Sequence, residues 1–473
     1  MSVLVQRPGA GFASRLKRAR GAALAAVLGC QLMVVIDATI VNVALPDMQR
    51  DLHFSPAALS WVLNAYTLTF GGLLLLGARL GDILGRRATF VSGVVLFTVA
   101  SAVGGLADDA AVLLIARAAQ GVGAAFAAPA ALALLMALYP EGRERMRALG
   151  LFTAVSVGGF SLGLVLGGAL TETLGWRAVL YVNVPLGILV AAAAALVLPA
   201  TARESRHFDL AGAVTSTAGV GLLVYGLVKA AEAGWSSTVA LGAIAGGVAL
   251  LAVFVIVERR AAEPITPMRL FASVTRSSAL AGRLLMVAGN LGMMFFLTQF
   301  MQDVMHLSPL VTGLCYLPMT GAVFLATQLS ARYFTRLIPP RKLLVAGFAL
   351  QGLSLLWVSQ LSVGTTYVDL VIPFVLFGFG GGSTFLSLTN SALDGVHPDD
   401  AGAASGVVNA MQQLGGTLGL AVLVAVFGAV SSGISTPAGY TDAVSETFVV
   451  AALLLLANAV LMFVTQPRVV PAR

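Results

Sequence analysis

An aspartate and an arginine inside long apolar segments are the residues of this chain with the clearest chemical potential. Asp37 is the only carboxylate well inside such a segment, at 21–45, and Arg117 lies inside another, at 111–138. A charge near the centre of a bilayer costs at least about 2.5–3.5 kcal/mol, so such residues are functional candidates by default. Burial also favours the neutral form of a carboxyl group, which suits an aspartate to carrying protons. A structural aspartate satisfied by a buried partner is the alternative.

The two charges are expected at the same depth. Asp37 lies eight residues before Leu45, the expected outer end of its segment, and Arg117 lies eight residues after Asp109. At 1.5 Å of rise per residue, both would lie roughly 12 Å below the outer surface. An arginine beside Asp37 would favour the charged carboxylate, and its movement would make the proton affinity depend on conformation. The alternatives are a purely structural ion pair and an Arg117 that snorkels outward.

Long apolar segments make up most of the chain. Of its 473 residues, 58% are hydrophobic and 10% are charged, and the mean hydropathy is +0.93. A soluble domain carries roughly 25% charged residues, so the composition predicts a polytopic membrane protein. A helix needs about 20 apolar residues to cross the hydrocarbon core. About fourteen segments meet this requirement: 21–45, 58–77, 88–106, 111–138, 148–170, 178–199, 209–229, 237–257, 278–300, 310–330, 342–361, 367–389, 403–429 and 445–465.

The positions of the charges orient these segments. Most of the 28 Lys and Arg residues fall on one set of alternate loops and tails, and only Arg50, Arg177 and Lys229 fall on the other. Cytoplasmic loops carry such an excess, so both termini are expected in the cytoplasm, beneath an inner (plasma) membrane. The pI near 9.8 therefore reflects membrane orientation, and no nucleic-acid partner is expected. The outer loops instead carry acidic residues: Asp47, Asp51, Asp108, Asp109, Glu172, Asp369 and Asp442.

An internal duplication divides the chain into two halves. One pattern, expected just outside the first helix of each half, recurs at an offset of 253, and two glycine pairs recur at an offset of 257. The copies are Met48-Gln49-x-x-x-His53-x-Ser55-Pro56 and Met301-Gln302-x-x-x-His306-x-Ser308-Pro309, Gly121-x-Gly123 and Gly378-x-Gly380, and Gly158-Gly159 and Gly415-Gly416. Repeated halves with a site between them near the midplane are a transporter architecture.

The predicted fold is therefore all-α, with two six-helix halves and two inserted central helices. A cytoplasmic tail (1–20) precedes the N-terminal half (21–200). The inserted helices and their linkers (201–277) precede the C-terminal half (278–465), and a second cytoplasmic tail (466–473) follows. The sequence predicts no role for the inserted pair.

A glycine-rich loop joins the second and third predicted helices. It reads Gly77-Ala78-Arg79-Leu80-Gly81-Asp82-Ile83-Leu84-Gly85-Arg86-Arg87. Glycines allow a tight turn between closely packed helices, and an aspartate can engage a neighbouring helix N-terminus or a basic side chain. An ordinary positive-inside loop would explain the arginines but not the spacing of the glycines and the aspartate.

This loop resembles the cytoplasmic signature of the major facilitator superfamily. The resemblance implies a gating role for Gly77, Gly81, Asp82, Gly85, Arg86 and Arg87. The position after the aspartate is often basic in that signature and is Ile83 here. The segment Val35-Ile36-Asp37-Ala38-Thr39-Ile40-Val41-Asn42-Val43-Ala44-Leu45-Pro46 resembles the first-helix signature of the fourteen-helix drug:proton antiporter family. The same family fits Arg117-Ala-Ala-Gln120-Gly121-Val-Gly123, Trp176-Arg177, Asn183-Val-Pro185-Leu-Gly187 and Gly402-Ala-Ala-Ser405-Gly406, so the resemblance covers nearly the whole chain.

The fifth predicted helix carries glycines at a spacing of four residues. Gly159, Gly163 and Gly167, with Gly168 beside them, form a smooth face that lets another helix approach closely. The family resemblance implies that this helix holds an antiport motif, a glycine pattern with proline after the middle glycine. Leu164 takes the place of that proline, which weakens the case for antiport but not for transport.

Other polar and aromatic residues are candidates for a substrate cavity, with helix–helix hydrogen bonds or interface anchors as the alternative. They are Asn42, Tyr66, Gln120, Asn290, Phe296, Gln299, Gln302, Asn409 and Gln412. Arg283 lies about five residues into the ninth segment and is expected to snorkel to the cytoplasmic interface rather than contact substrate.

These features predict a proton-coupled secondary transporter that exports small amphipathic drugs or antibiotics by alternating access. The chain has no Ser/His/Asp set, metal-ligand cluster or Gly-Lys-Ser phosphate loop, so neither an enzyme nor an ATP-driven pump is expected. The expected partners are a small amphipathic substrate, protons and the bilayer, and the protein is expected to be a monomer without a cofactor or a metal. The alternatives are a dedicated exporter of one metabolite or self-made antibiotic, and a non-transporting membrane sensor with the same fold.

Overall fold

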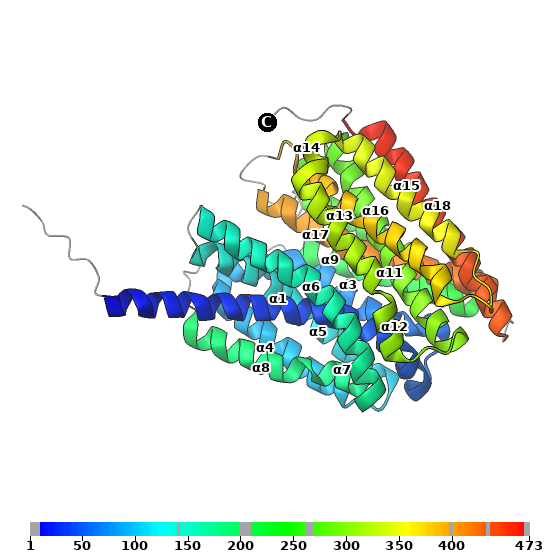
Figure 1. Ribbon diagram of the computed structural model, residues 1–473, viewed down its shortest axis with the longest axis horizontal. Coiled ribbons are helices and arrows are strands. Elements are labelled where there is room, and N and C mark those ends of the chain that lie inside the picture. The colour runs from blue at the N-terminus through cyan, green and yellow to red at the C-terminus, as the bar shows by residue number, and fades with distance from the viewer. Residues whose placement is uncertain are drawn as a thin grey trace, which may run out of the picture.

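The computed structural model describes residues 10–139, 142–198, 210–260, 268–396, 401–431 and 436–467. All regular secondary structure in these ranges is helical, and fourteen of the helical stretches are long and apolar enough to cross a membrane. Figure 1 shows most of the long helices side by side along the long axis of the molecule. A bilayer leaves no water for backbone groups, so spans of this kind must satisfy their hydrogen bonds within each helix.

The first eight helices form the N-terminal half. They are α1 (Ala10–Leu52), α2 (Pro56–Leu59), α3 (Trp61–Leu84), α4 (Arg86–Gly105), α5 (Ala110–Leu138), α6 (Arg143–Leu174), α7 (Arg177–Tyr181) and α8 (Asn183–Val197). Helix α1 runs past Leu45, where the sequence suggested its outer end, to Leu52, and an ion pair joins Asp47 and Arg50 on this extension. The duplicated Met48-Gln49 pair is therefore inside the helix and not outside it.

The C-terminal half repeats this order after the inserted pair α9 (Leu210–Ala233) and α10 (Thr238–Arg260). Its helices are η1 (Met268–Phe271), α11 (Val274–Gln299), η2 (Phe300–Val304), α12 (Pro309–Cys315), α13 (Leu317–Leu329), η3 (Ser330–Phe334), α14 (Thr335–Leu337), α15 (Pro340–Val358), α16 (Tyr367–Leu393), α17 (Ala401–Ser431) and α18 (Pro437–Thr465).

The duplication is visible in backbone geometry as well as in sequence. His53 and His306 both adopt a positive φ, of 54° and 55°, where the first long helix of each half ends. Ser55 and Ser308 then cap the next helix by accepting a hydrogen bond from a backbone N–H three residues on. The same short turn therefore starts the second membrane crossing of both halves.

The glycine pairs also make equivalent contacts in the two halves. A Cβ on Gly121 would overlap the carbonyl oxygen of Tyr66, and a Cβ on Gly378 would overlap that of Met319. The residues at 66 and 319 are themselves separated by the offset of 253 that the first pattern shows. Glycine thus lets the second and fourth crossings of each half approach backbone to backbone.

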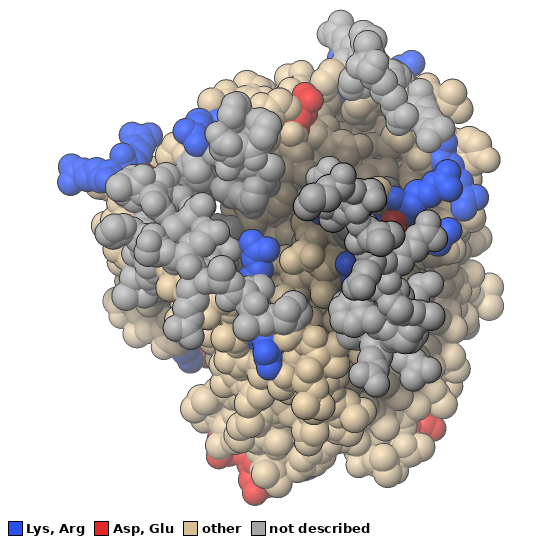
Figure 2. Space-filling model, turned by 90° about the vertical axis from the view of Figure 1, so that its left-hand side faces the viewer, with Lys and Arg blue, Asp and Glu red and all other residues tan. Residues whose placement is uncertain are grey.

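The helix ends gather at two chemically different ends of the molecule. The basic end carries, among others, Arg86, Arg87, Arg143, Arg259, Arg260, Arg341 and Lys342. The acidic end carries Asp47, Asp51, Asp108, Asp109, Glu172 and Asp369. The basic end is the left-hand side of Figure 1 and faces the viewer in Figure 2, where Lys and Arg side chains outnumber Asp and Glu. The separation of basic and acidic residues that the sequence predicts is thus present in the folded molecule.

The two halves touch closely at the acidic end. Gly168 on α6 faces the backbone of Pro309 and Leu310 on α12, and Gly313 on α12 faces the carbonyl of Leu164. Glu172 accepts a hydrogen bond from the backbone N–H of Leu310, with 3.1 Å between Oε2 and N. A second cross-half bond joins Gln302 Nε2 to the carbonyl oxygen of Val43 at 2.8 Å.

The same face of α6 is uncovered toward the basic end. Positions eighteen residues apart on an α-helix point in the same direction, because about 18 residues make five turns. Gly168 is buried against the C-terminal half and Thr171 is buried one turn further on, whereas Gly150 and Thr153, eighteen residues earlier, are exposed. The halves therefore meet at the acidic end and separate toward the basic end.

Helix α9 lies in the seam between the halves, and α10 packs on its outer side. A Cβ on Gly72 of α3 would be 2.6 Å from Thr217 Oγ1 of α9, and one on Gly428 of α17 would be 2.6 Å from the Ala231 carbonyl oxygen. Helix α10 meets α9 through another glycine, where a Cβ on Gly247 would be 2.8 Å from the Gly219 carbonyl oxygen. The inserted pair therefore joins both halves.

Candidate functional site

Asp37 is the centre of a polar cluster inside the N-terminal half. Its side chain is 0% exposed, and three side chains donate hydrogen bonds to it. Arg117 Nη1 lies 2.7 Å from Oδ2, while Gln120 Nε2 and Asn183 Nδ2 lie 3.0 Å and 2.8 Å from Oδ1. The donors come from α5 and α8, so three separate crossings meet at one carboxylate. Helical depth predicted this meeting of Asp37 and Arg117.

Arg117 is held as tightly as its partner. Its Nε donates to the carbonyl oxygen of Val62 at 2.9 Å, and its Nη1 also donates to Gln120 Oε1 at 2.9 Å. The ring of Tyr66 lies 4.5 Å from the guanidinium carbon. Gln120 in turn donates to Ser101 Oγ on α4 at 2.7 Å. The guanidinium charge is balanced by Asp37 and fixed from three directions.

Asn183 reaches this cluster from the start of α8. Val182, which separates α7 from α8, keeps helical dihedrals (φ −59°, ψ −28°), so Asn183 lies in a nearly continuous helix even though Pro185 has no N–H to donate to the Tyr181 carbonyl. Asn183 is 1% exposed at the first turn of α8. The sequence singled out Asn183 only as part of a family string and did not assign it to Asp37. The depth of Asn183 could have indicated this contact, because Asn183 lies only six residues from Arg177 at the acidic end.

The three donors around Asp37 suit a negatively charged carboxylate. Three donors and a neighbouring guanidinium favour the charged form of a buried aspartate, whereas isolation in an apolar interior favours the protonated form. A movement of α5 relative to α1 that separates Arg117 from Asp37 would break this cluster. Every described partner of Asp37 belongs to the N-terminal half, so the cluster is not itself the space between the halves.

The candidate gating loop lies at the basic end, where α3 passes into α4. Gly77 packs against the Ala125 carbonyl of α5, and Gly85 adopts a φ of 95°, which favours glycine. Arg87 donates to the Ala195 carbonyl of α8 within the same half. Gly81 has only the Arg86 side chain nearby, 3.8 Å from the place of a Cβ. The side chain of Asp82 lies outside the described residues.

The glycine face of α6 packs on α1. Cβ atoms on Gly159, Gly163 and Gly167 would meet Leu32, Thr39 and Ile40 in turn, whereas Gly168 faces α12 in the other half. Leu164 is 0% exposed, and its carbonyl faces Gly313 of α12. The residue that replaces the family's proline therefore lies in the contact between the halves.

The nine cavity candidates divide by exposure. Asn290 and Gln412 are partly exposed and Asn409 is exposed, and all three lie on α11 or α17 of the C-terminal half. Gln120 and Tyr66 belong to the Asp37 cluster, and Gln302 bridges the halves at the acidic end. The remaining candidates are buried, at 1–3% exposure: Asn42, Phe296 and Gln299.

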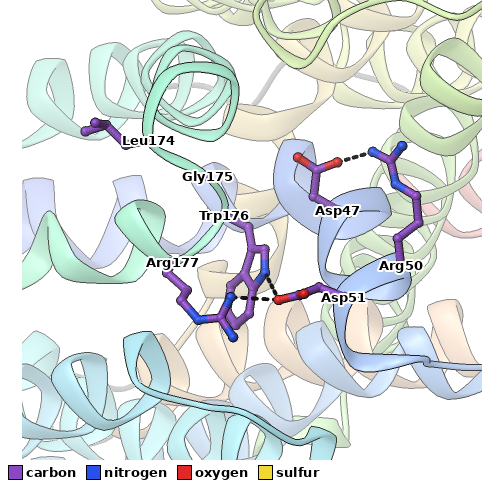
Figure 3. A pocket seen from close by; sticks show the side chains of 7 residues that line it. All are labelled: Asp47, Arg50, Asp51, Leu174, Gly175, Trp176 and Arg177. Atoms are coloured by element: carbon purple, nitrogen blue, oxygen red, sulfur yellow. Dashed lines mark hydrogen bonds and ion pairs between the residues drawn. The ribbon is translucent and has the colours of Figure 1, made fainter.

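A second polar arrangement ties α1 to α7 at the acidic end. Figure 3 shows Trp176 and Arg177 both directed at Asp51, with Nε1 and Nη1 at 2.9 Å and 2.7 Å from the carboxylate. Arg177 also donates to the Ala107 carbonyl at 3.0 Å and stacks on the Trp176 ring at 4.4 Å. These residues line a surface pocket, but every contact is within the N-terminal half, which indicates a structural clasp.

Comparisons with known proteins agree with this architecture. The family model described as Major Facilitator Superfamily matches residues 27–219 and 210–420. The Cephamycin export protein CmcT of Amycolatopsis lactamdurans is 41% identical over 96% of this chain and 94% of its own length. The Puromycin resistance protein pur8 of Streptomyces alboniger is 41% identical over 85% of this chain and 80% of its own.

A solved structure shares the fold at low sequence identity. It is a bacterial homologue of the human lysosomal transporter Spinster, in an inward-facing and unoccupied conformation. The two chains superpose with a TM-score of 0.69 at 17% identity, covering 94% of this chain and 97% of the other. The likeness confirms the overall arrangement of the helices.

Proposed function

Because the chain belongs to the Major Facilitator Superfamily, we propose that it exports small amphipathic compounds in exchange for protons, with Asp37 as the proton site. Its relatives are exporters and resistance proteins, and the chain is a multi-pass membrane transporter and not an enzyme. The observation that carries the proton role is the ion pair of Asp37 and Arg117, 2.7 Å apart and at most 1% exposed. A charge pair this deep costs free energy to bury, which a transport role would explain.

The basic end is the cytoplasmic end in this proposal, and the membrane is the inner (plasma) membrane. The excess of Lys and Arg at that end follows the positive-inside rule. Helix α1 starts at the basic end and α18 finishes there, so both termini would lie in the cytoplasm. The conformation is then one that is open toward the cytoplasm and closed on the outside.

The transport cycle that we infer alternates this state with its opposite. In the outward-open state Asp37 takes up a proton and the drug leaves. A protonated carboxyl accepts fewer hydrogen bonds, so Arg117 is freed to move. In the inward-open state Arg117 returns to Asp37, the proton leaves to the cytoplasm and new drug binds between the halves. Rocking of one half against the other exchanges the two states.

The loop from Gly77 to Arg87 is proposed to act in the outward-open state. In the present state Arg87 bonds within its own half. When the basic ends of the halves close, Asp82, Arg86 and Arg87 would latch them, as the family signature implies. The partly exposed Asn290, Asn409 and Gln412 would contact drug in the space that closes. A monomer is sufficient for this cycle, because each half supplies one wall.

The proton role is tested by transport in inside-out vesicles that carry a pH-sensitive dye. Asp37→Asn keeps the size and two hydrogen-bonding atoms of the side chain but cannot be charged, so addition of drug should release no protons. Asp51→Asn, the same change on the same helix at the acidic end, is the matched control and should keep coupling. Proton release by Asp37→Asn at the wild-type rate would remove Asp37 from the mechanism.

A narrower function is the second candidate. The cephamycin and puromycin relatives are each named for a single antibiotic. A dedicated exporter would protect cells against one compound only, whereas a multidrug exporter would protect against several. Growth of cells with and without the protein, on dyes, quaternary ammonium compounds and antibiotics, separates the two. No protection by a protein that also transports nothing in vesicles would favour a sensor.

A further inference from the structure

Arg283 is a buried guanidinium whose hydrogen bonds are incomplete. It lies on α11 at 3% exposure, with Nη2 donating to Thr389 Oγ1 of α16 at 2.5 Å. Its Nε and Nη1 are buried and have no hydrogen-bond partner among the described residues. The sequence suggested a side chain that reaches the interface, but Arg283 instead remains between two helices of the C-terminal half.

The contrast with Arg117 shows what Arg283 lacks. Arg117 has a carboxylate at 2.7 Å, a carbonyl and an amide oxygen as acceptors. Arg283 has one hydroxyl and the ring of Phe385, which lies 4.1 Å from the guanidinium carbon. A buried charge without a counter-ion is costly, and each unmade hydrogen bond adds to that cost. An anion would supply the missing charge and the missing acceptors together.

The face of α16 beside Arg283 is turned away from the middle of its exposed aliphatic stripe. Along α16, the exposed apolar residues Val368, Ile372 and Val375 form one stripe. At 100° per residue, Phe385 and Thr389 lie roughly 105° and 70° from the middle of that stripe. On α11, the partly exposed Asn290 lies seven residues from Arg283, two turns on and on the same face. A compound between the halves would meet Phe385 and Asn290 on either side of Arg283.

We infer that Arg283 binds the acidic group, a carboxylate or sulfonate, of amphipathic substrates, with Phe385 against their apolar part. This inference names a substrate class for the proposed transport function and rests on that function. Thr389 uses only one of the two N–H bonds of Nη2, so the other pairs with Nε or with Nη1 as one free edge of the guanidinium, which suits an oxyanion with two acceptor oxygens. An anionic lipid headgroup has the same chemistry, so the experiment must separate the two sources.

The test compares two fluorescent dyes that differ by one acidic group. Anilinonaphthalene sulfonate and phenylnaphthylamine share an aromatic frame, and only the first carries a sulfonate. Their binding is titrated with the full-length protein in phosphatidylcholine nanodiscs. Arg283→Gln should weaken binding of the sulfonate by about tenfold or more and leave phenylnaphthylamine within about twofold. Arg341→Gln is the matched control, because Arg341 also stacks on a phenylalanine, Phe463 at 3.8 Å, but between α15 and α18.

Each outcome decides the inference. Unchanged sulfonate binding in Arg283→Gln overturns it, and an equal loss of both dyes shows a structural role and overturns it too. Rescue of sulfonate binding by Arg283→Lys supports it, because lysine keeps the charge. Phosphatidylglycerol that displaces the sulfonate dye from wild type would assign the site to lipid. The dye titration measures binding and does not depend on transport. The export proposal would fail in a different measurement, the absence of dye movement in vesicles.

Discussion

The two halves of the molecule share a scaffold and differ in chemistry. Both have the same histidine turn and the same glycine contacts between crossings. At the offset of 253, Asp37 corresponds to Asn290, and at the offset of 257, Arg117 corresponds to Phe374. Where the N-terminal half buries an ion pair, the C-terminal half stacks Phe374 on Tyr316, with ring centroids 5.3 Å apart. Close backbone packing is thus common to both halves, whereas the positions that hold the charge pair in one half hold Asn290 and Phe374 in the other.

This difference suggests a division of labour. The N-terminal half contains an ionisable pair that is fully satisfied by its own helices. The C-terminal half has an aromatic core, partly exposed polar residues, and Arg283, whose Nε and Nη1 have no hydrogen-bond partner among the described residues. Proton handling would then belong to one half and most of the substrate recognition to the other. Three experiments test whether the contrast holds.

The largest effect is expected from breaking the ion pair. Arg117→Met leaves Asp37 buried without its counter-ion, which should destabilise the protein by about 3–5 kcal/mol. Phe374→Leu, at the corresponding place in the C-terminal half, should cost only about 1 kcal/mol. Thermal unfolding followed by tryptophan fluorescence gives the ranking. The double variant Asp37→Asn/Arg117→Met should recover part of the loss, and no recovery would show that Arg117 acts mainly through packing.

An equal effect in both halves is expected from the shared glycines. Gly121→Ala and Gly378→Ala each place a Cβ against a carbonyl oxygen of the neighbouring crossing. Each should cost about 1–3 kcal/mol, because helix backbones cannot separate without disturbing the core. Gly158→Ala has nothing within 4 Å of the new Cβ and is the control. A large loss at only one of the two positions would contradict a scaffold that packs equivalently in both halves.

The smallest effect is expected at the contact between the halves. Glu172→Ala removes the acceptor for the Leu310 N–H and should weaken closure of the acidic end by about 1 kcal/mol. That corresponds to roughly a fivefold change in the ratio of molecules with the acidic end closed to molecules with it open. Spin labels at Leu174 and Val311, with Cys30 and Cys315 replaced, would report a larger population at long distance. Arg177→Gln changes only the clasp within one half and should leave the distances unchanged.

Sequence reasoning located the crossings and the depth of charges, but not which way side chains face. Asp37 and Arg117 were paired because the rise along a helix fixes depth. Gln120 was a candidate for the substrate cavity, with a helix–helix hydrogen bond as the alternative, and it bonds Asp37; the sequence left the choice open because the direction of a side chain around the helix depends on how neighbours pack. Asn183 lies at a similar depth and also bonds Asp37, but its depth alone does not show that it faces α1. Arg283 was expected to reach the cytoplasmic interface, because the sequence does not show that its side chain faces α16.

The role of the inserted helices became visible only in three dimensions. Their sequences are apolar and carry no motif, so nothing in them indicates a neighbour. In the structure α9 contacts α3 of one half and α17 of the other through Gly72 and Gly428. Since these are long-range contacts between surfaces of small residues, periodicity alone could not reveal them.

The position of α9 makes the molecule one-sided within the plane of the membrane. Two six-helix halves leave two lateral seams through which a compound dissolved in the lipid could slip between them. Protein fills the seam between α3 and α17, so that route is sealed along α9. The other seam, beside α6, keeps Gly150 and Thr153 uncovered. Apolar compounds that enter from the bilayer would therefore reach the space between the halves through the seam beside α6. This is the helix whose Gly168 packs on the other half at the acidic end.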